Sequence, residues 1–429
     1  MMLDVMNEVA EPTFDHRPSI LEVQKIWATR SVQERTRFLR PLRHLIAKDA
    51  DDLGEAAAQV TGRPLAEKLV AEVLPLAEAC KWLEKSATKI LSSRLIGKKG
   101  RPLWLGNVSF EVQRQPHGLI LIIGPGNYPL FLPAVQALHA LVAGNAVLLK
   151  PAPGAGRVIH HFAQLVKATG LNNGLLTILP ETVAAAHEAI SQGVDKVIFT
   201  GSSENGRDVL SALSDANIPS TMELSGVDPV LVLQDADLDL VVRALDFGTK
   251  LNAGETCIKP RWLLVHDSVA ENLRQQIAKA ELPAMRTEHF SDNQAAVDCV
   301  NAADYGLGAS IFTRDIAVGN KLGALLKTGF VTINDIIMPT ADPRMPFGGV
   351  KQSGFGVTRG DEGLLEMTFP HVVVTRKSQN HPHFDPLDQT DAELFSAYIR
   401  TAHGGGSTRW TAARELMSAL VKKVKNKKS

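Results

Sequence analysis

The sequence predicts an α/β protein with a doubly wound, Rossmann-like parallel sheet, a second α/β region and a small β element. Short apolar runs alternate with helical patterns over residues 118–224, and a similar alternation continues over residues 258–333. Short apolar runs are typical of strands that are buried on both faces, and strand–helix alternation indicates parallel pairing. An isolated pattern of alternating polar and apolar residues at 108–113 predicts the β element.

The N-terminal region, residues 20–92, predicts successive amphipathic helices. Leu39, Leu42 and Ile46 recur at helical spacing, as do Leu69 and Val73. The strand expected at 108–113 follows a Gly-Asn turn at 106–107. The expected elements of the first α/β region are strands at 119–123, 146–149, 175–179, 197–199 and 221–224, with helices at 130–142 and 158–168.

Four polar or glycine positions follow these expected strands directly, namely Asn127, Lys150, Gly201 and Glu223. Ligands of doubly wound sheets bind beyond the carboxyl ends of the strands. We therefore expect these four residues to line one crevice. The alternatives for single positions are a solvated lysine, a surface glutamate and a turn-forming asparagine.

The second region and the tail complete the chain. Strands are expected at 262–265, 309–312 and 329–333, and helices at 269–280 and 293–302. Residues 379–390 are rich in Pro, Asp and His and predict a linker. Residues 408–429 predict a basic amphipathic helix. This helix either packs on the protein or is solvated, or it lies on an anionic membrane surface or docks into a partner. The apolar face of this helix is expected to hold Trp410, Ala413, Leu416, Met417, Leu420, Val421 and Val424.

The composition is that of a globular protein of two or more domains. The 429 residues are 45% hydrophobic and 21% charged, and 46 basic side chains balance 46 acidic ones. No net field favours nucleic acid. We expect no leader, membrane span or metal site, and the three cysteines show no disulfide spacing, so we expect a reducing, cytoplasmic setting.

Cys257 is the candidate nucleophile. Cys80 and Cys299 lie in helical patterns and are typical of core thiols, whereas Cys257 ends the loop Asn-Ala-Gly-Glu-Thr-Cys at 252–257. A thiol on a loop of small residues is accessible to substrate and to activation by backbone N–H groups. Glu223 at a strand end is a candidate general base, and the Asn127 amide is a candidate donor to an oxyanion.

Six motifs in this order resemble the aldehyde dehydrogenase superfamily, over residues 20–377. They are Gly-Pro-Gly-Asn-Tyr-Pro at 124–129, Lys-Pro-Ala-Pro at 150–153, Phe-Thr-Gly-Ser at 199–202, Glu-Leu-Ser-Gly at 223–226, Gly-Glu-Thr-Cys at 254–257 and Pro-Phe-Gly-Gly-Val-Lys-Gln-Ser-Gly at 346–354. Asn-Asp-Ile-Ile-Met at 334–338 resembles the shorter branch of the family, which includes fatty aldehyde dehydrogenases.

The resemblance implies oxidation of an aldehyde to a carboxylic acid. A Cys257 thiohemiacetal, stabilised by Asn127, would pass a hydride to NAD or NADP, and water activated by Glu223 would hydrolyse the thioester. A homodimer or homotetramer is expected. The cofactor-binding residues implied are Ile123, Pro125, Lys150, Gly201, Ser202, Leu224, Glu288 and Phe290. The implied parts are a dinucleotide-binding domain at 1–98 and 117–222, a catalytic domain at 223–360, an oligomerisation element at 99–116 and 361–377, and the linker and tail helix at 378–429.

Two departures from the family pattern change these expectations. Pro153 stands where relatives often carry a glutamate that binds ribose hydroxyls, so NADP becomes as acceptable as NAD and no strong NAD preference is expected. The segment after Cys257 is several dozen residues shorter than in relatives. Glu288 and Phe290 are either the remnant of the Glu-x-Phe element that holds the nicotinamide ribose, or part of an ordinary surface loop.

Two other functions remain open at this point. One is a CoA-acylating aldehyde dehydrogenase, which Glu223 disfavours because water activation competes with CoA. The other is a catalytically weakened scaffold or binding protein that keeps the fold, which the shortened segment suggests. Release of free acid, of acyl-CoA, or of no product distinguishes the three.

Overall fold

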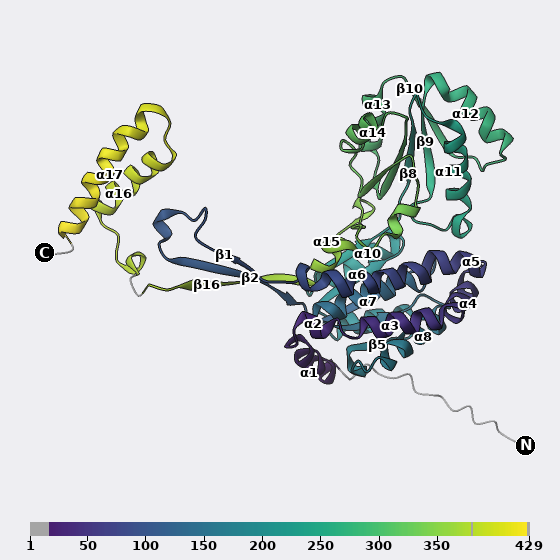
Figure 1. Ribbon diagram of the computed structural model, residues 1–429, viewed down its shortest axis with the longest axis horizontal. Helices are drawn as coiled ribbons and strands as arrows, with labels where there is room; N and C mark the ends of the chain where they lie inside the picture. The colour runs from purple at the N-terminus through teal and green to yellow at the C-terminus, as the bar shows by residue number, and fades with distance from the viewer. Residues whose placement is uncertain (1–16, 379–380, 427–429) are drawn as a thin grey trace, which may run out of the picture. The chain divides into compact units, whose positions relative to one another are not determined.

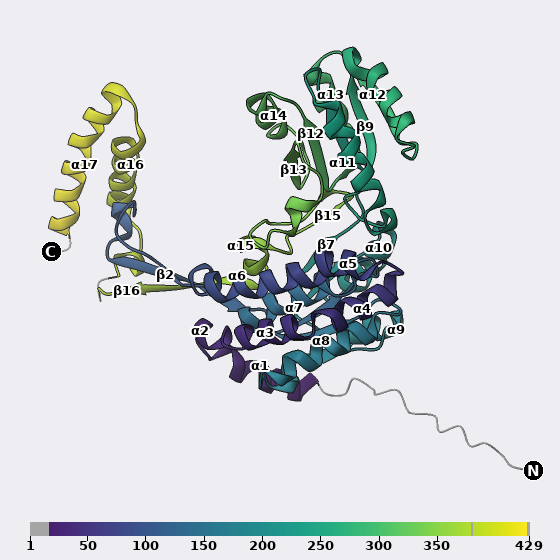
Figure 2. The same cartoon turned by 45° about the vertical axis from the view of Figure 1, so that its right-hand side comes forward.

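The computed structural model describes residues 17–378 and 381–426. The chain forms two compact units. The first comprises residues 1–94 and 112–372, and the second residues 95–111 and 373–429. The first unit contains every candidate site residue named above, and its two main sheets are drawn in Figures 1 and 2.

The first unit opens with helices, as the Leu and Ile spacing predicts. Leu39, Leu42 and Ile46 are completely buried and form the core face of one of them. The helices are α1 (Arg17–Ala28), α2 (Val32–Arg35), α3 (Leu39–Lys48), α4 (Ala50–Thr61), α5 (Leu65–Lys68) and α6 (Leu74–Ile90). A π-helical turn, η1 (Leu69–Val73), joins α5 to α6.

A six-stranded sheet with the order β15-β7-β6-β3-β4-β5 lies at the centre of this region. Strands β3 to β7 pair in parallel, and only β15 runs antiparallel, against β7. Every residue of β3, β4 and β6 is buried, which explains their continuous apolar runs. The strands are β3 (Leu119–Ile123), β4 (Ala146–Lys150), β5 (Leu176–Ile178), β6 (Lys196–Thr200), β7 (Ser220–Glu223) and β15 (Gly354–Phe355).

Helices cover this sheet and begin directly after its strands. α7 (Phe131–Ala143) is buried along its whole length, whereas α8 (Gly156–Ala168) buries one face. α10 (Ser203–Ser214) begins at Ser202, whose hydroxyl accepts from the Asn205 backbone N–H. A short 3-10 turn, η3 (Asn173–Leu175), and α9 (Val183–Ser191) flank β5. The helix starts therefore lie at the carboxyl edge of the sheet.

A second sheet has the order β10-β9-β8-β12-β13 and is parallel throughout. α11 and α12 lie on one face and α13 and α14 on the other, as Figures 1 and 2 show. The strands are β8 (Asp228–Val232), β9 (Pro260–His266), β10 (Arg286–Phe290), β12 (Gly308–Phe312) and β13 (Phe330–Ile333). The helices are α11 (Leu238–Lys250), α12 (Asp267–Lys279), α13 (Asn293–Ala302) and α14 (Ile316–Gly323).

Small elements complete the first unit. β11 (Tyr305–Gly306) pairs antiparallel with β14 (Val350–Lys351). Two 3-10 turns, η4 (Leu251–Gly254) and η5 (Met338–Ala341), and the short helix α15 (Gly360–Leu365) lie near the candidate site residues in sequence. Gly354 of β15 has φ +105°, and a Cβ there would lie 1.9 Å from the Met222 carbonyl oxygen. Only glycine therefore allows β15 to pair beside Glu223.

The predicted β element belongs to a three-stranded sheet whose strands are divided between the two units, and the second unit also contains a helical pair. β1 (Arg94–Ile96), β2 (Val108–Pro116) and β16 (Thr368–Arg376) form a three-stranded sheet in that order. The short turns are η2 (Leu103–Leu105) and η6 (Pro382–Phe384), and the helices are α16 (Gln389–His403) and α17 (Gly406–Asn426). The linker expected up to residue 390 thus ends inside a helix that the sequence analysis did not predict.

The face assigned to the tail helix needs correction. α17 packs on α16 through Ala412 and Ala419, whereas Trp410 and Met417 are 78% and 64% exposed. Small residues form the contact because they let two helices approach closely. Lys427 and Lys428 lie outside the described residues. No helix in the described part of the chain has the length and apolar character needed to cross a bilayer.

Candidate active site

An elongated cavity of about 540 Å³ opens at the carboxyl edge of the six-stranded sheet. Asn127, Lys150, Gly201 and Glu223 all line it, and so does Cys257. The predicted crevice is therefore confirmed, and it is reached by segments that are more than 100 residues apart. Ile123, Pro125, Ser202 and Leu224, the other residues expected to contact a cofactor here, line the same cavity.

The loop that carries Cys257 has an unusual backbone. Asn252, Ala253 and Gly254 in η4 have φ values of +52°, +55° and +76°. Left-handed conformations are costly for residues other than glycine and persist only where surrounding contacts impose them. Asn252 has such a contact, because its backbone N–H donates to Glu67 Oε1 at 2.7 Å. Arg261 fixes the end of the loop, since its guanidinium donates to the carbonyl oxygens of Cys257 at 3.0 Å and Thr256 at 3.2 Å.

The Cys257 thiol is half-buried and lies among charged groups. Burial raises its pKa to about 12, and the negative charges of Glu223 and Asp228 add to this effect. The positive charge of Arg359 and the Ile258 backbone N–H act in the opposite direction. In the arrangement described here the sulfur therefore rests as a thiol and must lose its proton before it can attack.

Glu223 ends β7 and is 2% exposed. Its Oε2 atom accepts a hydrogen bond from the Thr358 hydroxyl at 3.1 Å, and its Oε1 atom has no hydrogen-bond partner among residues 17–378 and 381–426. Burial raises the pKa of this carboxyl, while Arg359 and the hydroxyls of Thr358 and Thr200 oppose the increase. A carboxyl with a raised pKa and one free oxygen has the properties of a general base that acts near neutral pH.

Asn127, which follows β3 of the six-stranded sheet, is hydrogen-bonded to the loop that carries Cys257. Its Nδ2 atom donates to the Glu255 carbonyl oxygen at 2.7 Å, and its Oδ1 atom accepts from the Tyr128 backbone N–H at 3.0 Å. The amide nitrogen carries a second hydrogen, so one donor is used to fix the side chain and another remains for a ligand. Tyr128 adds a contact between its hydroxyl and that of Thr256 at 2.9 Å.

A buried ion pair is connected to Asn127 through the side chain of Asn252. Lys68 and Glu72 are both completely buried, with 3.1 Å between Nζ and Oε1. Lys68 also donates to Asn252 Oδ1 at 3.0 Å, and Asn252 Nδ2 donates to the Asn127 carbonyl oxygen at 2.9 Å. Glu72 accepts from the Leu130 backbone N–H at 2.7 Å. Both charges lie at the π-helical turn, a feature frequent at functional sites.

A second cavity reaches Cys257 from another direction. It shares Cys257, Glu223 and Thr256 with the first cavity, so the thiol lies where the two cavities meet. The rest of its lining is mostly apolar, and Val70, Phe247 and Met338 of this lining are each more than one-third exposed. The main apolar lining residues are Val70, Ala71, Phe131, Leu132, Phe247, Leu251, Ile258, Ile337, Met338 and Phe347.

The first cavity has features that fit a dinucleotide. It follows the strand ends at Lys150 and Gly201, and α10 begins beside it. A helix start offers backbone N–H groups to phosphate. Glu181, after β5, accepts from the backbone N–H groups of Gly154 at 2.5 Å and Gly156 at 2.6 Å. A carboxylate thus occupies the loop that begins with Pro153, although the sequence motif there lacks one.

Glu288 and Phe290, the pair expected to hold the nicotinamide ribose, are not brought together with the other predicted site residues. Both lie on β10, the edge strand paired in parallel with β9. Glu288 pairs with Arg286, and Phe290 is 6% exposed in the core of the second sheet. Neither lines the cavity. Within the shortened segment after Cys257, residues 286–290 therefore form a strand of the second sheet.

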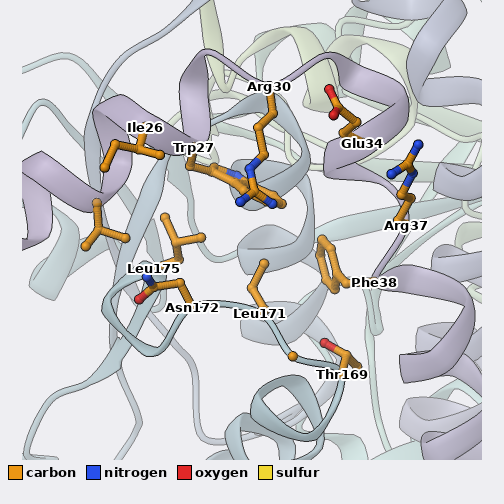
Figure 3. Close-up of a pocket in the computed structure, with 12 residues that line it drawn as sticks. Ile26, Trp27, Arg30, Glu34, Arg37, Phe38, Thr169, Leu171, Asn172 and Leu175 are labelled. Carbon is orange, nitrogen blue, oxygen red and sulfur yellow. The ribbon is translucent and has the colours of Figure 1, made fainter.

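A third cavity lies apart from the reacting groups, between α1, α2 and the turn before β5 (Figure 3). Arg30 lies over the Trp27 ring at 5.4 Å, and Phe38 lies beside it. The Trp27 indole N–H donates to the Leu141 carbonyl oxygen at 2.7 Å, which ties α1 to α7. These contacts indicate that the residues here hold the helices together.

Sequence reasoning missed Arg359, Lys68 and Glu181, all of which contact the site or its supports. Arg359 is 4% exposed and lines the apolar cavity. Lys68 and Glu72 have the i,i+4 spacing of a helical ion pair, which is a signal present in the sequence, but surface pairs share it. Nothing in the local sequence marks Arg359 or Glu181, because their partners are distant along the chain.

The two largely parallel sheets and the cavity at the strand ends of the six-stranded one define a nucleotide-binding α/β enzyme with a thiol in its cavity. The chain belongs to the aldehyde dehydrogenase family, whose sequence profile matches residues 19–287 and 282–373. It is an NAD(P)-dependent aldehyde dehydrogenase, which oxidises an aldehyde to a carboxylic acid.

Named relatives agree with this assignment. The chain is 29% identical to a 4,4'-diapolycopene aldehyde oxidase of Methylomonas sp, over 89% of this chain and 85% of the relative. It is 27% identical to the peroxisomal aminoaldehyde dehydrogenase 1 of Pisum sativum, over 83% and 85% of the two chains.

Solved structures share the fold. A putative aldehyde dehydrogenase from Burkholderia cenocepacia superposes with a TM-score of 0.78 at 22% identity, covering 86% of this chain and 91% of that one. A succinic semialdehyde dehydrogenase from Streptococcus pyogenes, solved with NADP+, gives 0.77 at 20% identity, covering 85% and 96%. The predicted fold class is confirmed.

Proposed function

We propose that Cys257 is the nucleophile, Asn127 an oxyanion donor and Glu223 the general base of this oxidation. The observation that carries the proposal is the position of Cys257 and Glu223, which line both cavities at the point where these meet. A substrate in the apolar cavity and a dinucleotide in the polar one would approach the same sulfur. A thiol and a carboxyl with one free oxygen are the groups that the two half-reactions require.

In the first half-reaction the Cys257 thiolate forms a bond to the carbonyl carbon, and the carbonyl oxygen becomes an oxyanion. The second hydrogen on Asn127 Nδ2 stabilises this oxyanion, and one such donor contributes about 3 kcal/mol to transition-state stabilisation. Lys150, Gly201 and Ser202, which line the first cavity, would hold NAD or NADP, and the bound cofactor would supply the acceptor for the hydride. The acyl group then remains on Cys257 as a thioester.

In the second half-reaction Glu223 removes a proton from water through its free Oε1 atom. The hydroxide adds to the thioester carbon, and the carbon–sulfur bond breaks with return of the thiolate. The carboxylic acid leaves, and Glu223 releases its proton to solvent. The Thr358 hydroxyl fixes the other carboxylate oxygen during this step. Hydrolysis is thus favoured over acyl transfer to CoA.

The lining of the apolar cavity favours an uncharged, apolar aldehyde as substrate. Its wall is formed by aliphatic and aromatic side chains, and Arg359 and Glu223 are its charged members. A screen of NAD(P)H formation with short, long and aromatic aldehydes tests this. Greater kcat/KM for long or aromatic aldehydes than for short ones supports the proposal, and an equal or reversed order contradicts it.

We expect Glu223→Gln to separate the two half-reactions. The variant keeps the shape of the side chain but cannot accept a proton, so it will form about one NAD(P)H per chain and then slow by a hundredfold or more. Stopped-flow absorbance measures the burst and the steady rate. Glu204→Gln, an exposed change on α10, is the control and should turn over at the unaltered rate. Steady turnover without a burst in Glu223→Gln contradicts the role.

The position of Glu181 bears on the choice between NAD and NADP. Its carboxylate lies beside Lys150, whose ammonium pKa is lowered by burial and raised by Glu181. We expect Glu181→Gln to raise kcat/KM for NADP relative to NAD by about tenfold, since loss of the negative charge removes repulsion of the 2′-phosphate. Glu188→Gln on α9 is the matched control. An unchanged ratio in Glu181→Gln refutes this role.

Assembly and location stay predictions. The sheet β1-β2-β16 exposes Phe369, Val372 and Val373, each more than 40% exposed. Exposed apolar strands of this kind favour pairing with a second copy, so we expect a homodimer or homotetramer in the cytoplasm. Light scattering tests the mass. Sedimentation with anionic vesicles, with and without residues 404–429, tests membrane contact by the tail helix.

A further inference from the structure

Arg359 is a buried cation that forms no ion pair with any residue the structure describes. Its guanidinium lies over the Phe347 ring at 4.3 Å and the Phe131 ring at 5.5 Å, and it donates to the Thr340 carbonyl oxygen. Within the described part of the chain its Nε atom has no hydrogen-bond partner, and Glu223 acts on it through charge without a direct ion pair. Burial of an unpaired charge is costly, so the fold must gain something elsewhere.

The groups that share its cavity show what the charge can act on. Arg359 lines the apolar cavity together with Cys257 and Glu223, and Thr358, the residue before it, donates to Glu223. The loop before α15 therefore brings a hydroxyl and a cation to the two reacting groups in consecutive positions. The cation interacts with the negative forms of both groups, as well as with that of Tyr128.

We propose that Arg359 is a positioning residue whose charge favours the thiolate of Cys257 and the carboxylate of Glu223 in a cavity that otherwise disfavours both. The inference rests on the proposed role of Cys257. When Arg359 is present, either Cys257 or Glu223 can lose its proton to solvent, and the three side chains together then carry no net charge. Without Arg359, each ionisation leaves an uncompensated negative charge in an apolar wall.

The other charged groups near these residues act in known directions. Glu223 and Asp228 raise the pKa of the Cys257 thiol, and Arg359 lowers it. Tyr128 is neutral because burial raises its pKa, and His139 is neutral because burial and the Arg359 charge lower its pKa to about 3. The positive charge of Arg261 lowers the pKa of the Asp228 carboxyl, against the larger effect of burial. Removal of the Arg359 charge should therefore shift the thiol further from ionisation.

Alkylation of Cys257 by iodoacetamide tests the proposal without aldehyde or cofactor. The full chain and the variants Arg359→Met, Arg359→Gln and Arg359→Lys are labelled across a range of pH, and the Cys257 peptide is quantified by mass spectrometry. The thiolate is the reactive form, and one pKa unit changes its amount tenfold. We expect the two neutral variants to label about tenfold more slowly at each pH and Arg359→Lys within about threefold of the unaltered chain.

Cys299 is the internal reference, since it lies on α13 and pairs with Glu288. Its labelling rate should be the same in all four proteins. Arg359→Gln keeps hydrogen-bond donors, so it provides a second neutral variant if Arg359→Met does not fold, and thermal melting checks each protein. Neutral variants that label at the unaltered rate overturn the proposal. The role of Cys257 would stand in that case, because loss of activity in Cys257→Ser tests it separately.

Discussion

Replacing Cys257 with serine will lower aldehyde-dependent NAD(P)H formation by at least about a thousandfold. A serine hydroxyl is a far weaker nucleophile than a thiolate. The change is nearly isosteric at a half-buried residue on the edge of a hydrophobic core, where two cavities meet, so the fold should tolerate it. Absorbance of the reduced cofactor, measured at saturating aldehyde, gives kcat directly.

Cys299→Ser is the matched control for this substitution. Cys299 is also half-buried, but it lies on α13 and donates to Glu288 at 3.3 Å. Its replacement should leave kcat within about twofold of the unaltered value. Residual activity above a few per cent in Cys257→Ser, with the control unchanged, would show that another group forms the covalent bond.

Lys68→Met will lower the free energy of unfolding by about 3 to 5 kcal/mol. The change removes one partner of a completely buried ion pair and leaves Glu72 without its nearest cation. Burial already raises the pKa of Glu72, and Lys68 opposes this effect. Without Lys68 the buried Glu72 carboxyl will therefore take up a proton. The loss also frees Asn252, which fixes the Asn127 backbone, and kcat should fall as well. Urea unfolding followed by circular dichroism measures the stability.

Lys81→Met is the control for the buried pair. Lys81 pairs with Glu78 on α6 at 3.2 Å, but both side chains are close to half-exposed. Surface pairs contribute little, so its loss should change the unfolding free energy by no more than about 0.5 kcal/mol. Equal changes in the unfolding free energy for the two substitutions would mean that the buried pair stabilises the fold no more than a surface pair does.

The strand ends explain why much of the site could be predicted from the sequence. Each of Asn127, Lys150, Gly201 and Glu223 follows a buried apolar run, and parallel strands have their carboxyl ends at one edge. Topology alone therefore places these residues together. Cys257 was indicated by its loop of small residues and then by the family motifs, whereas the periodicity of the strands could not identify it.

β10 and α16 show where sequence reasoning failed. Residues 286–290 carry charged side chains because β10 is an edge strand, and only Phe290 at its end is well buried. An edge strand of this kind does not differ from a loop in sequence. α16 buries only Asp391 and Ala397, so its apolar stripe is too narrow to predict a helix.

The sequence could not predict the roles of Arg359, Lys68 and Glu181, because these roles depend on tertiary contacts. Arg359 acquires its setting from Phe131 and Phe347, and Lys68 acts through Asn252, 184 positions away. A charged residue in a sequence is read as exposed unless a buried partner is known. Such partners become visible only when the chain is folded.

The most direct test of the central claim is to trap the acyl group on Cys257. The protein is mixed with aldehyde and NAD or NADP, quenched in acid during turnover, and its peptides are weighed by mass spectrometry. The account predicts a mass increase equal to the acyl group on the Cys257 peptide, and a larger fraction of it in Glu223→Gln. Formation of NAD(P)H with no acyl group on Cys257, or with the adduct on another residue, would contradict it.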